Sequence, residues 1–288
     1  MSKSLKQDYA YCENIIKTSS KSFYTAFSKL PKAKAKAVYA IYAFCRQADD
    51  TVDTQEPLKQ KKENLGKLEQ DLQKFVQGET PDHPMWRALK DVFSRYEMDA
   101  NPFFEQIEGQ KQDLNFKAIK DLKALKQYSY YVAGSVGLML LPILSKENGV
   151  NQEIKESALS LGIAMQLTNI LRDIGEDYKD NNRIHLPADL IHYYDVNLEK
   201  NMTSGPDSAF MELWEAIAAE AEEDYQQFFK KIHLYDEDCR FPVLVSAKLY
   251  RAILESVRKN NYDCLQSRNF VPQKRMLELV LAAKKALK

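Results

Sequence analysis

Apolar residues recur at spacings of three and four along almost the whole sequence of 288 residues. That spacing places them on one face of an α-helix, and no stretch alternates apolar and polar residues for long enough to predict a strand. Only 9 glycines and 10 prolines interrupt the pattern. The sequence therefore predicts an all-α protein, with helices near 6–18, 21–29, 34–55, 58–77, 84–97, 101–111, 121–144, 151–180, 207–233, 238–260 and 272–286.

No internal repeat, low-complexity tract or linker divides the chain, so we expect residues 1–288 to form a single helical-bundle domain. The longest stretch without a helical pattern is 181–206, which we interpret as a loop or lid. Apolar residues make up 44% of the sequence, which is enough for a sizeable core.

The charges and cysteines limit the classes of partner. The 41 Lys and Arg residues balance 41 Asp and Glu residues, so a basic nucleic-acid-binding surface is not indicated. The longest apolar stretch, Tyr131–Leu144, is too short to span a bilayer, and the first eight residues carry no apolar signal region. Cys12, Cys45, Cys239 and Cys264 form no C-x-x-C pair, so we expect reduced thiols. These features favour a cytoplasmic protein whose membrane contact, for instance during product release, is at most peripheral.

Two acidic clusters carry the clearest chemical signal. The first is Asp49, Asp50 and Asp53 in YAIYAFCRQADDTVD, and the second is Asp173 and Asp177 in AMQLTNILRDIGED. Spacings of three and four place each cluster on one helix face, where like charges repel unless a cation lies between them. A single acidic cluster is more often a solvated surface. Both clusters here, however, end strongly apolar helices, where carboxylates need a metal or another charge.

The residues around the clusters favour a diphosphate site. An all-oxygen ligand set is typical of Mg²⁺, which bridges carboxylates to substrate phosphates. Asn169 lies one turn before Asp173, and Gln166 lies one turn earlier still. Arg46 and Arg172 stand beside the two clusters, where each can bind diphosphate oxygens or pair with a neighbouring aspartate. EF-hand, zinc-site and glycine-rich phosphate-loop patterns are absent.

Two glycines inside the predicted helix 121–144 need a reason. Gly134 and Gly137 each cost a helix interior about 1 kcal/mol. One explanation is close packing against another helix. The other is a smooth wall for a long apolar ligand, to which Ala133 and Val136 would add. The sequence leaves both explanations open.

Together these motifs resemble the squalene/phytoene synthase family. The resemblance covers nearly the whole chain and rests on SKSF at 20–23, YAFCRQADDTVD at 42–53, YYVAGSVG at 130–137, QLTNILRDIGED at 166–177 and RIHLP at 183–187. It implies the isoprenoid synthase fold, with one α-domain around a central apolar cavity. It also implies a transferase in which Mg²⁺ ions on the two acidic motifs assist ionisation of one prenyl diphosphate. The allylic cation then joins a second prenyl diphosphate through a cyclopropyl diphosphate intermediate.

The resemblance assigns roles to individual residues. It implies metal ligands at Asp49, Asp50, Asp53, Asn169, Asp173 and Asp177. It implies that catalysis depends on Asp49, Asp53, Asp173, Asp177, Tyr42, Arg46 and Tyr128, the two tyrosines lying near the reacting carbons. The implied substrate-binding residues are Ser20, Lys21, Ser22, Tyr42, Arg46, Val132, Ala133, Gly137, Gln166, Asn169, Arg183, Tyr250 and Arg268.

One position departs from the family pattern. Where the family usually has a tyrosine two residues after the arginine of the last motif, this sequence has His185, and the glycine that usually precedes Arg183 is also missing. The departure concerns the hydrogen bonds of the lid. His185 either replaces the tyrosine as a donor or faces water.

The wording of SSKSF and DDTVD most resembles the bacterial dehydrosqualene (diapophytoene) synthases of this family. That implies two farnesyl diphosphates, no reductant and a place in carotenoid biosynthesis. Phytoene synthase, which uses geranylgeranyl diphosphate, and NADPH-dependent squalene synthase remain alternatives. A chain-elongating prenyltransferase or terpene cyclase would share the acidic helices, although an elongating enzyme usually has arginines where Thr54–Pro57 stand here. A non-catalytic helical partner protein would share the fold alone.

Overall fold

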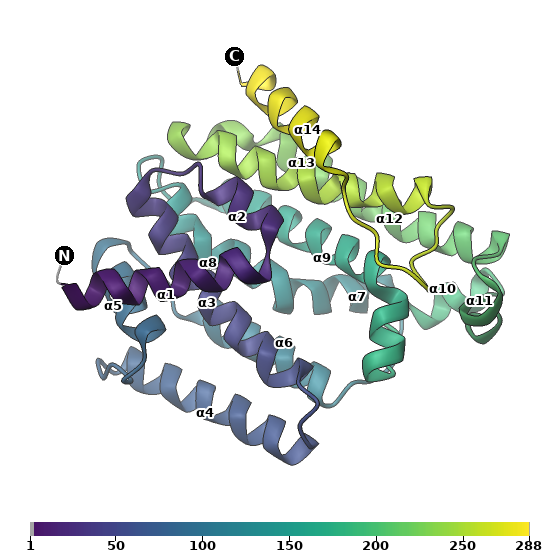
Figure 1. Ribbon diagram of the computed structural model, residues 1–288, viewed down its shortest axis with the longest axis horizontal. Coiled ribbons are helices and arrows are strands. Elements are labelled where there is room, and N and C mark those ends of the chain that lie inside the picture. The colour runs from purple at the N-terminus through teal and green to yellow at the C-terminus, as the bar shows by residue number, and fades with distance from the viewer. Residues whose placement is uncertain (1–2, 288) are drawn as a thin grey trace.

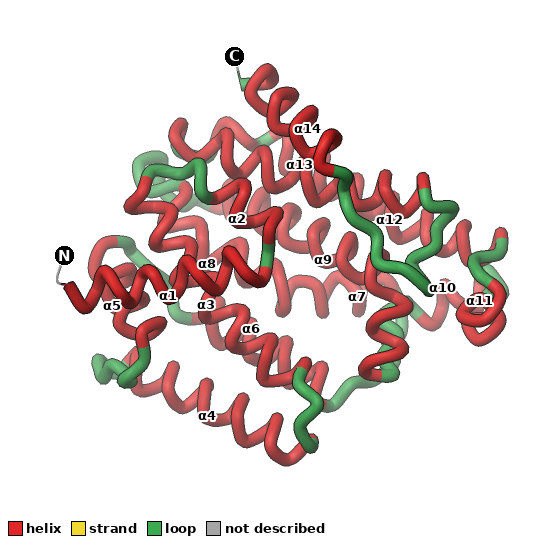
Figure 2. Tube along the Cα trace, in the orientation of Figure 1, coloured by secondary structure: helices red, strands yellow, loops and turns green. Residues whose placement is uncertain are grey.

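The computed structural model describes residues 3–287 and contains helices and loops, but no strand, in that range (Figures 1 and 2). The all-α prediction is confirmed. In chain order the elements are α1 (Lys3–Ser19), α2 (Lys21–Phe27), α3 (Lys32–Asp53), α4 (Leu58–Val76), α5 (Pro84–Arg95), α6 (Asn101–Leu114), α7 (Leu122–Ser129), the π-helical turn η1 (Tyr130–Gly134), α8 (Ser135–Leu144), α9 (Gln152–Asn181), α10 (Ala188–Tyr193), α11 (Leu198–Ser204), α12 (Ser208–Lys230), the 3₁₀ turn η2 (Ile232–Leu234), α13 (Glu237–Lys259) and α14 (Gln273–Ala286).

Local sequence fixes the ends of α9, the long helix that carries the second acidic cluster. The Asn151 side chain accepts a hydrogen bond from the Ile154 amide at 3.0 Å and so caps the first turn. At the other end, Asn182 adopts the left-handed conformation with φ of 51°, which stops the helix. The cluster therefore lies in the last three turns of a helix whose two ends are both well defined.

The buried side chains form two main clusters that meet in the middle of the molecule. One lies mainly among α1, α3, α5, α6 and α8, and the other mainly among α7, α9, α12 and α13. The partly buried side chains of Phe23 and Leu161 pack against both. In Figure 1, α9 runs through the centre, with α4 at the lower edge and α14 at the upper edge. The boundary between the two clusters is where the two acidic helices face a common space.

The prediction of one continuous helix over 121–144 is wrong at Tyr130–Gly134, where the chain forms a π-helical turn between α7 and α8. Close packing against α9 accounts for the glycines here. A Cβ on Gly162 would lie 2.5 Å from the Ala133 carbonyl oxygen, and one on Gly137 would lie 2.7 Å from that of Ala158. Side chains at these positions would force the helices apart. Gly137 also lines the central cavity, so the explanation of a wall for an apolar ligand stays a prediction at this position.

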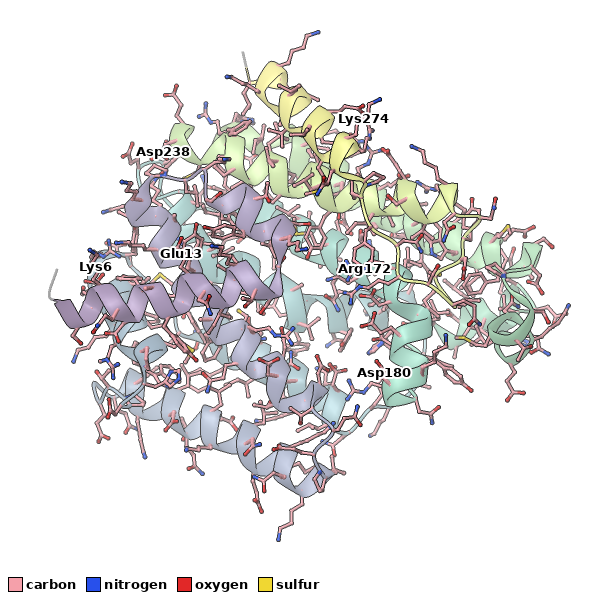
Figure 3. The ribbon with its side chains drawn as sticks, in the orientation of Figure 1. Lys6, Glu13, Arg172, Asp180, Asp238 and Lys274 are labelled. Carbon is pink, nitrogen blue, oxygen red and sulfur yellow. The ribbon has the colours of Figure 1, made fainter. Side chains whose placement is uncertain are left out.

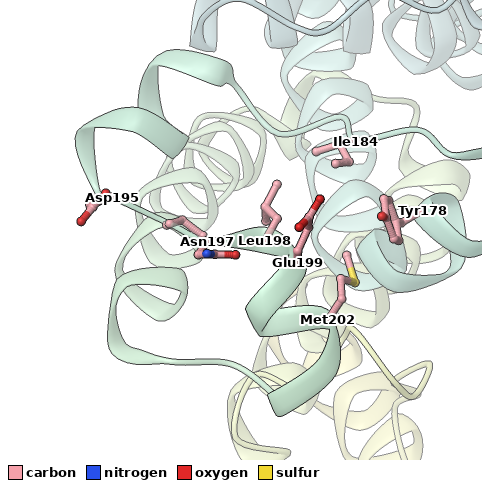
Figure 4. A pocket seen from close by; sticks show the side chains of 8 residues that line it. Tyr178, Ile184, Asp195, Asn197, Leu198, Glu199 and Met202 are labelled. Atoms are coloured by element: carbon pink, nitrogen blue, oxygen red, sulfur yellow. The ribbon is translucent and has the colours of Figure 1, made fainter.

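The interpretation of 181–206 as an irregular loop is also wrong. The segment contains two short helices, α10 and α11, and the Asn197 side chain caps α11 by accepting a hydrogen bond from the Lys200 amide at 2.9 Å. The predicted helix 151–180 continues to Asn181. An open hollow of about 510 Å³ lies between this segment and the end of α9, next to Tyr178 and Met202 (Figure 4). Helices this short lacked a readable apolar period in the sequence.

All four cysteines are free, as expected from the sequence, and the structure adds that all four are buried. Within residues 3–287, no helix combines the length and the apolar character needed to cross a bilayer.

Candidate active site

An apolar cavity of about 210 Å³ lies between the two core clusters. Its walls come from α2, α3, α6, η1, α8, α9 and α13, and its polar lining includes Asp49 of α3, Gln106 of α6, and Gln166 and Asn169 of α9. Eight of the site residues predicted from the sequence line it, which are Tyr42, Asp49, Val132, Ala133, Gly137, Gln166, Asn169 and Tyr250. The structure therefore brings Asp49 of the first motif, the glycine-bearing segment, and Gln166 and Asn169 of the second motif to one cavity. Asp50, Asp53, Asp173 and Asp177 are not among the residues that line it.

Polar side chains mark one end of the cavity, which we call the mouth. The directions of the helices locate the opposite end of the cavity. Asp49 stands at the mouth, and Val38 lines the cavity eleven residues earlier on α3, which corresponds to about 16 Å of helix. Sulfur atoms of Cys45 and Met139 lie 3.9 Å apart, so α3 and α8 are aligned at this level. The Leu144 carbonyl at the end of α8 accepts a hydrogen bond from the Asp236 amide at 3.0 Å, and Asp236 pairs with Lys34 at the start of α3. Leu144 therefore lines the cavity at the end that lies away from Asp49. A long apolar chain that enters at the mouth would end there.

Asp49 is held by two buried glutamines of α6. Its Oδ1 accepts hydrogen bonds from Gln110 Nε2 at 2.7 Å and from Gln106 Nε2 at 3.3 Å. Burial, followed by the nearby carboxylate of Asp53, raises the pKa of Asp49 to about 7, with Arg46 opposing the shift. A carboxylate with only neutral donors in a buried place is short of positive charge.

Two further oxygen atoms at the mouth also lack a positively charged or hydrogen-bonding partner. Asn169 Oδ1 and Gln106 Oε1 are buried and have no hydrogen-bond partner among the described residues. Both side chains line the cavity beside Asp49. Unpaired buried carbonyl oxygens are costly in a folded protein, and a hard cation would satisfy them. The residues present therefore fit a magnesium site of the kind expected from the sequence.

The second acidic motif reaches the first through a third carboxylate. Asp113, at the end of α6, accepts a hydrogen bond from the Tyr128 hydroxyl at 3.0 Å and lies 3.5 Å from His185 Nε2. The other ring nitrogen of His185, Nδ1, lies 3.2 Å from Asp177 Oδ2. The imidazole also stacks on the Tyr128 ring, with centroids 5.1 Å apart. His185 is thus a bridge between α6 and α9.

The charged groups around His185 shift one another's pKa values. Burial lowers the pKa of His185, but its contacts with Asp113 and Asp177 outweigh burial and raise the pKa to about 9. Burial also raises the pKa of Asp53, with Arg183 opposing and Asp113 adding to the shift. These carboxylates act on one another because they share one partly enclosed space.

Cations alternate with the carboxylates around the mouth. Arg46 pairs with Asp50 one turn further along α3. Asp173 is paired with the neighbouring Arg172 and lies 3.4 Å from Arg268 Nε. In Figure 3, Arg172 lies near the middle of the molecule and Asp180 lies further along α9. Each guanidinium has donors that a diphosphate would engage in place of its aspartate.

Arg183 and the segment 20–23 are the remaining predicted site residues near the mouth of the cavity. Arg183 Nη1 lies 3.9 Å from Asp53 Oδ1, which joins the segment after α9 to the first motif. Ser20 caps α2 by accepting a hydrogen bond from the Phe23 amide at 3.3 Å. The Phe23 ring stacks on Tyr250 at 4.8 Å between centroids. Lys21 is exposed and Ser22 is half-buried on the same short helix.

Comparisons with known proteins agree with this geometry. Residues 16–275 match the model of a family described as squalene/phytoene synthase. The chain belongs to the squalene/phytoene synthase family. It is 33% identical to the 4,4'-diapophytoene synthase of Staphylococcus haemolyticus over 93% of each chain. It is 34% identical to the 15-cis-phytoene synthase of Synechococcus elongatus over 95% of this chain and 91% of that one. A crystal structure of a dehydrosqualene synthase in complex with ligand superposes with a TM-score of 0.91 at 43% identity, covering 98% of this chain and 97% of that one.

Membership of the squalene/phytoene synthase family confirms the resemblance drawn from the sequence motifs and makes the chain a prenyltransferase-type synthase. Three residues of α6 at the mouth were not predicted from the sequence, namely Gln106, Gln110 and Asp113. Their spacing of four and three places them on one helix face, and two of them are buried amides. Polar residues on the otherwise apolar face of Phe103 and Ile107 were the available signal.

The alternative that His185 faces water is wrong in this member of the family. Its side chain is only 6% exposed and lies between two carboxylates. The α9 helix continues as far as Asn181, one residue beyond its predicted end, and Asp177 in its last turns lies at the level of His185.

A separate group of metal-type side chains lies at the start of α13, where ligand atoms of Asp236, Asp238 and Cys239 approach one another. The Lys34 ammonium already occupies this group, at 2.8 Å from Asp236 Oδ2 and 2.7 Å from Asp238 Oδ1. Asp236 also accepts hydrogen bonds from the backbone amides of Glu147 and Asn148. This group is a buried ion pair that ties α3, α8 and α13 together, and it is not the predicted magnesium site.

Proposed function

We propose that residues 1–288 form one synthase domain that condenses two farnesyl diphosphates head to head into dehydrosqualene, through presqualene diphosphate, for carotenoid biosynthesis. The observation that carries the proposal is the shared cavity. Carboxylates, amide oxygens and arginines gather at its mouth, and apolar side chains line the rest of it. Such a cavity accepts a molecule with a multiply charged head and a long hydrocarbon tail.

Oxygen ligands from two helices would hold Mg²⁺ at the mouth. Asp49, Asp50 and Asp53 would contribute from α3, and Asn169, Asp173 and Asp177 would contribute from α9. The unpartnered Asn169 Oδ1 and the raised pKa of Asp49 support this assignment. Magnesium bound there would neutralise charge that develops on the departing diphosphate.

The chain's own side chains would divide the remaining work. Arg46, Lys21, Arg183 and Arg268 would bind the two diphosphates, and Arg268 is already drawn towards α9 by Asp173 and Glu176. When the donor carbon–oxygen bond breaks, the apolar wall would keep water away from the allylic cation. The double bond of the second substrate would attack it, and loss of a proton would close the cyclopropane ring. A second ionisation, rearrangement and proton loss would give the hydrocarbon.

Aromatic side chains would surround the reacting carbons. Tyr42 and Tyr250 line the cavity. The Tyr128 hydroxyl donates a hydrogen bond to Asp113. Burial, followed by the Asp113 carboxylate, raises the pKa of Tyr128 well above its ordinary value, so its hydroxyl stays protonated. Aromatic faces attract a cation, and neutral phenols do not trap it as a nucleophilic phenolate would.

The choice of farnesyl diphosphate is supported by the closed end of the cavity at Leu144 and by the 43% identical dehydrosqualene synthase. A phytoene synthase that uses geranylgeranyl diphosphate is the second candidate, favoured by the 34% identical 15-cis-phytoene synthase. An NADPH-dependent squalene synthase is a third product outcome within the same family.

Product analysis tests the proposal. Purified protein would be incubated with Mg²⁺ and with labelled farnesyl or geranylgeranyl diphosphate, each with and without NADPH. The products would be identified by mass spectrometry. We expect dehydrosqualene from farnesyl diphosphate and no change on adding NADPH. Exclusive use of geranylgeranyl diphosphate, or a product made only with NADPH, would replace the proposal by one of its alternatives.

A further inference from the structure

The last helix presents an apolar stripe to solvent. Four of the nine exposed large apolar side chains among the described residues lie between positions 270 and 287. Phe270 is 71% exposed, Leu277 is 67% exposed and Leu281 is 68% exposed. Leu277 and Leu281 are four residues apart on α14 and so share one face. Exposed leucines and a phenylalanine concentrated on one terminal helix mark an interaction surface.

The opposite face of α14 is packed on the protein. Ala283 is fully buried against Val245 and Leu249 of α13, and Met276, Leu279 and Val280 add to this contact. Figure 1 shows α14 along the outer edge of the molecule, crossing α13. The helix is therefore already anchored, and the stripe of Leu277 and Leu281 is left without a partner.

Lysines flank this stripe. Lys274 precedes Leu277 by one turn, and Lys284 and Lys285 follow Leu281 by one turn. Lys274 points outward at the upper edge of the molecule in Figure 3. Within residues 3–287, these three ammonium groups form no ion pair, whereas the one acidic residue of the helix, Glu278, is paired with Arg275 at 3.3 Å. The outer face thus combines apolar side chains with uncompensated positive charge.

We propose that α14 docks the enzyme on an anionic lipid surface, with Leu277, Leu281 and Phe270 inserted among the acyl chains and the lysines at the headgroups. An apolar stripe rimmed by lysines is the pattern of a helix that lies in a membrane interface. A second copy of this chain fits the stripe poorly. Two such helices packed side by side in either direction would place lysines of one against lysines of the other.

The position of α14 connects this surface to the cavity. The buried cluster beneath α14 includes Ala26 of α2 and Leu249 of α13. The next residues on those two helices, Phe27 and Tyr250, line the cavity. One helix layer therefore separates the lipid-binding stripe from the cavity. Docking would let the hydrocarbon product, which dissolves only in lipid, pass from the cavity into the membrane. This role rests on the proposed function, whereas the docking itself does not.

Vesicle flotation tests the docking without using turnover. The full chain would be mixed with vesicles of phosphatidylcholine alone or of equal parts phosphatidylcholine and phosphatidylglycerol. We expect binding to the anionic vesicles that weakens as salt is raised. The double variant Leu277→Ser/Leu281→Ser should bind at least about tenfold more weakly, because two apolar side chains no longer insert. Lys284→Glu/Lys285→Glu should bind about twentyfold more weakly at low salt.

A matched control is available on α4, at the opposite edge of the molecule (Figure 1). Leu58, Lys59 and Lys62 are exposed there, so Leu58→Ser/Lys59→Glu/Lys62→Glu makes the same kinds of change elsewhere and should bind like the unmodified chain. Circular dichroism and turnover of detergent-dispersed substrate should be unaltered in both α14 variants, since α14 does not line the cavity. The proposal is overturned if the unmodified chain does not float. It is also overturned if the α14 variants float as well as the control, or if the leucine variant only abolishes self-association in gel filtration. An inactive chain that still floats would refute the proposed function alone.

Discussion

Replacing His185 by phenylalanine should destabilise the protein by about 3–4 kcal/mol, and the structure shows where that energy arises. The side chains of His185 and Asp113 are 6% and 10% exposed, so breaking their contact leaves a buried carboxylate without its cation. Removing one partner of a buried pair costs about 3–5 kcal/mol, and the Tyr128 hydroxyl that remains on Asp113 favours the low end. Asp177 is 31% exposed, so water replaces much of that contact and the loss there is at most about 1 kcal/mol.

Urea unfolding in the presence of a metal chelator, followed by far-ultraviolet circular dichroism, would measure these losses. His185→Tyr keeps one hydroxyl donor and should lose about 1–2 kcal/mol. In an Asp113→Asn background, His185→Phe should lose about 2 kcal/mol less than in the unmodified chain, because the buried charge is gone. The exposed His192, replaced by phenylalanine, is the control and should change stability by less than about 0.5 kcal/mol. A coupling of less than about 0.5 kcal/mol between positions 113 and 185 would refute the bridge.

Three further predictions concern the acidic motifs, the cavity end and a surface network. Asp49→Ala and Asp173→Ala should each abolish magnesium-dependent diphosphate release with unchanged helicity by circular dichroism, and retained activity in both variants would refute their assigned roles. Leu144→Ala should raise kcat/KM for geranylgeranyl relative to farnesyl diphosphate, whereas Leu141→Ala, buried outside the cavity, should not; equal ratios in the two variants would exclude Leu144 as the end wall. The Arg258 hydrogen bonds, opposed by burial, lower the pKa of Glu215, so the stability that Arg258→Met removes, about 1 kcal/mol, should be present above pH 4.5 and disappear as the pH falls through the lowered pKa. A difference that stays the same at acid pH, where the Glu215 carboxyl group is protonated, would contradict this linkage.

The helices were predictable wherever a long apolar face met a clear end signal. The predicted helix at 34–55 became α3 (Lys32–Asp53) and that at 151–180 became α9 (Gln152–Asn181), each correct within two residues. The π-helical turn at Tyr130–Gly134 was not predictable, because it is fitted to the close approach of Gly162 on another helix. The helices α10 and α11 have six and seven residues, which is too short for a periodic pattern to emerge.

For the candidate site, too, the features set by local sequence spacing were predictable and those set by long-range contacts were not. Sequence spacing placed Asp49 and Asn169 on the correct faces of their helices, and the structure brings both to one cavity. The partners of Asp49 on α6 depend on how α3 and α6 pack, which no local pattern encodes. The burial of His185 likewise depends on Asp113, which is 72 positions away in the sequence. Contacts between residues so far apart in the sequence can be identified only from the tertiary structure.

In the proposed function, carboxylates of α3 and α9 hold divalent cations around one substrate diphosphate while its tail fills the cavity between them. A crystal structure with Mn²⁺ and a farnesyl thiodiphosphate that cannot ionise tests it most directly, because manganese is located by its anomalous scattering. We expect manganese peaks within ligand distance of Asp49 or Asp53 and of Asn169 or Asp173, with the diphosphate between them and the tail directed towards Leu144. Manganese bound at Asp236 and Asp238, or a thiodiphosphate lodged outside the cavity, would contradict it.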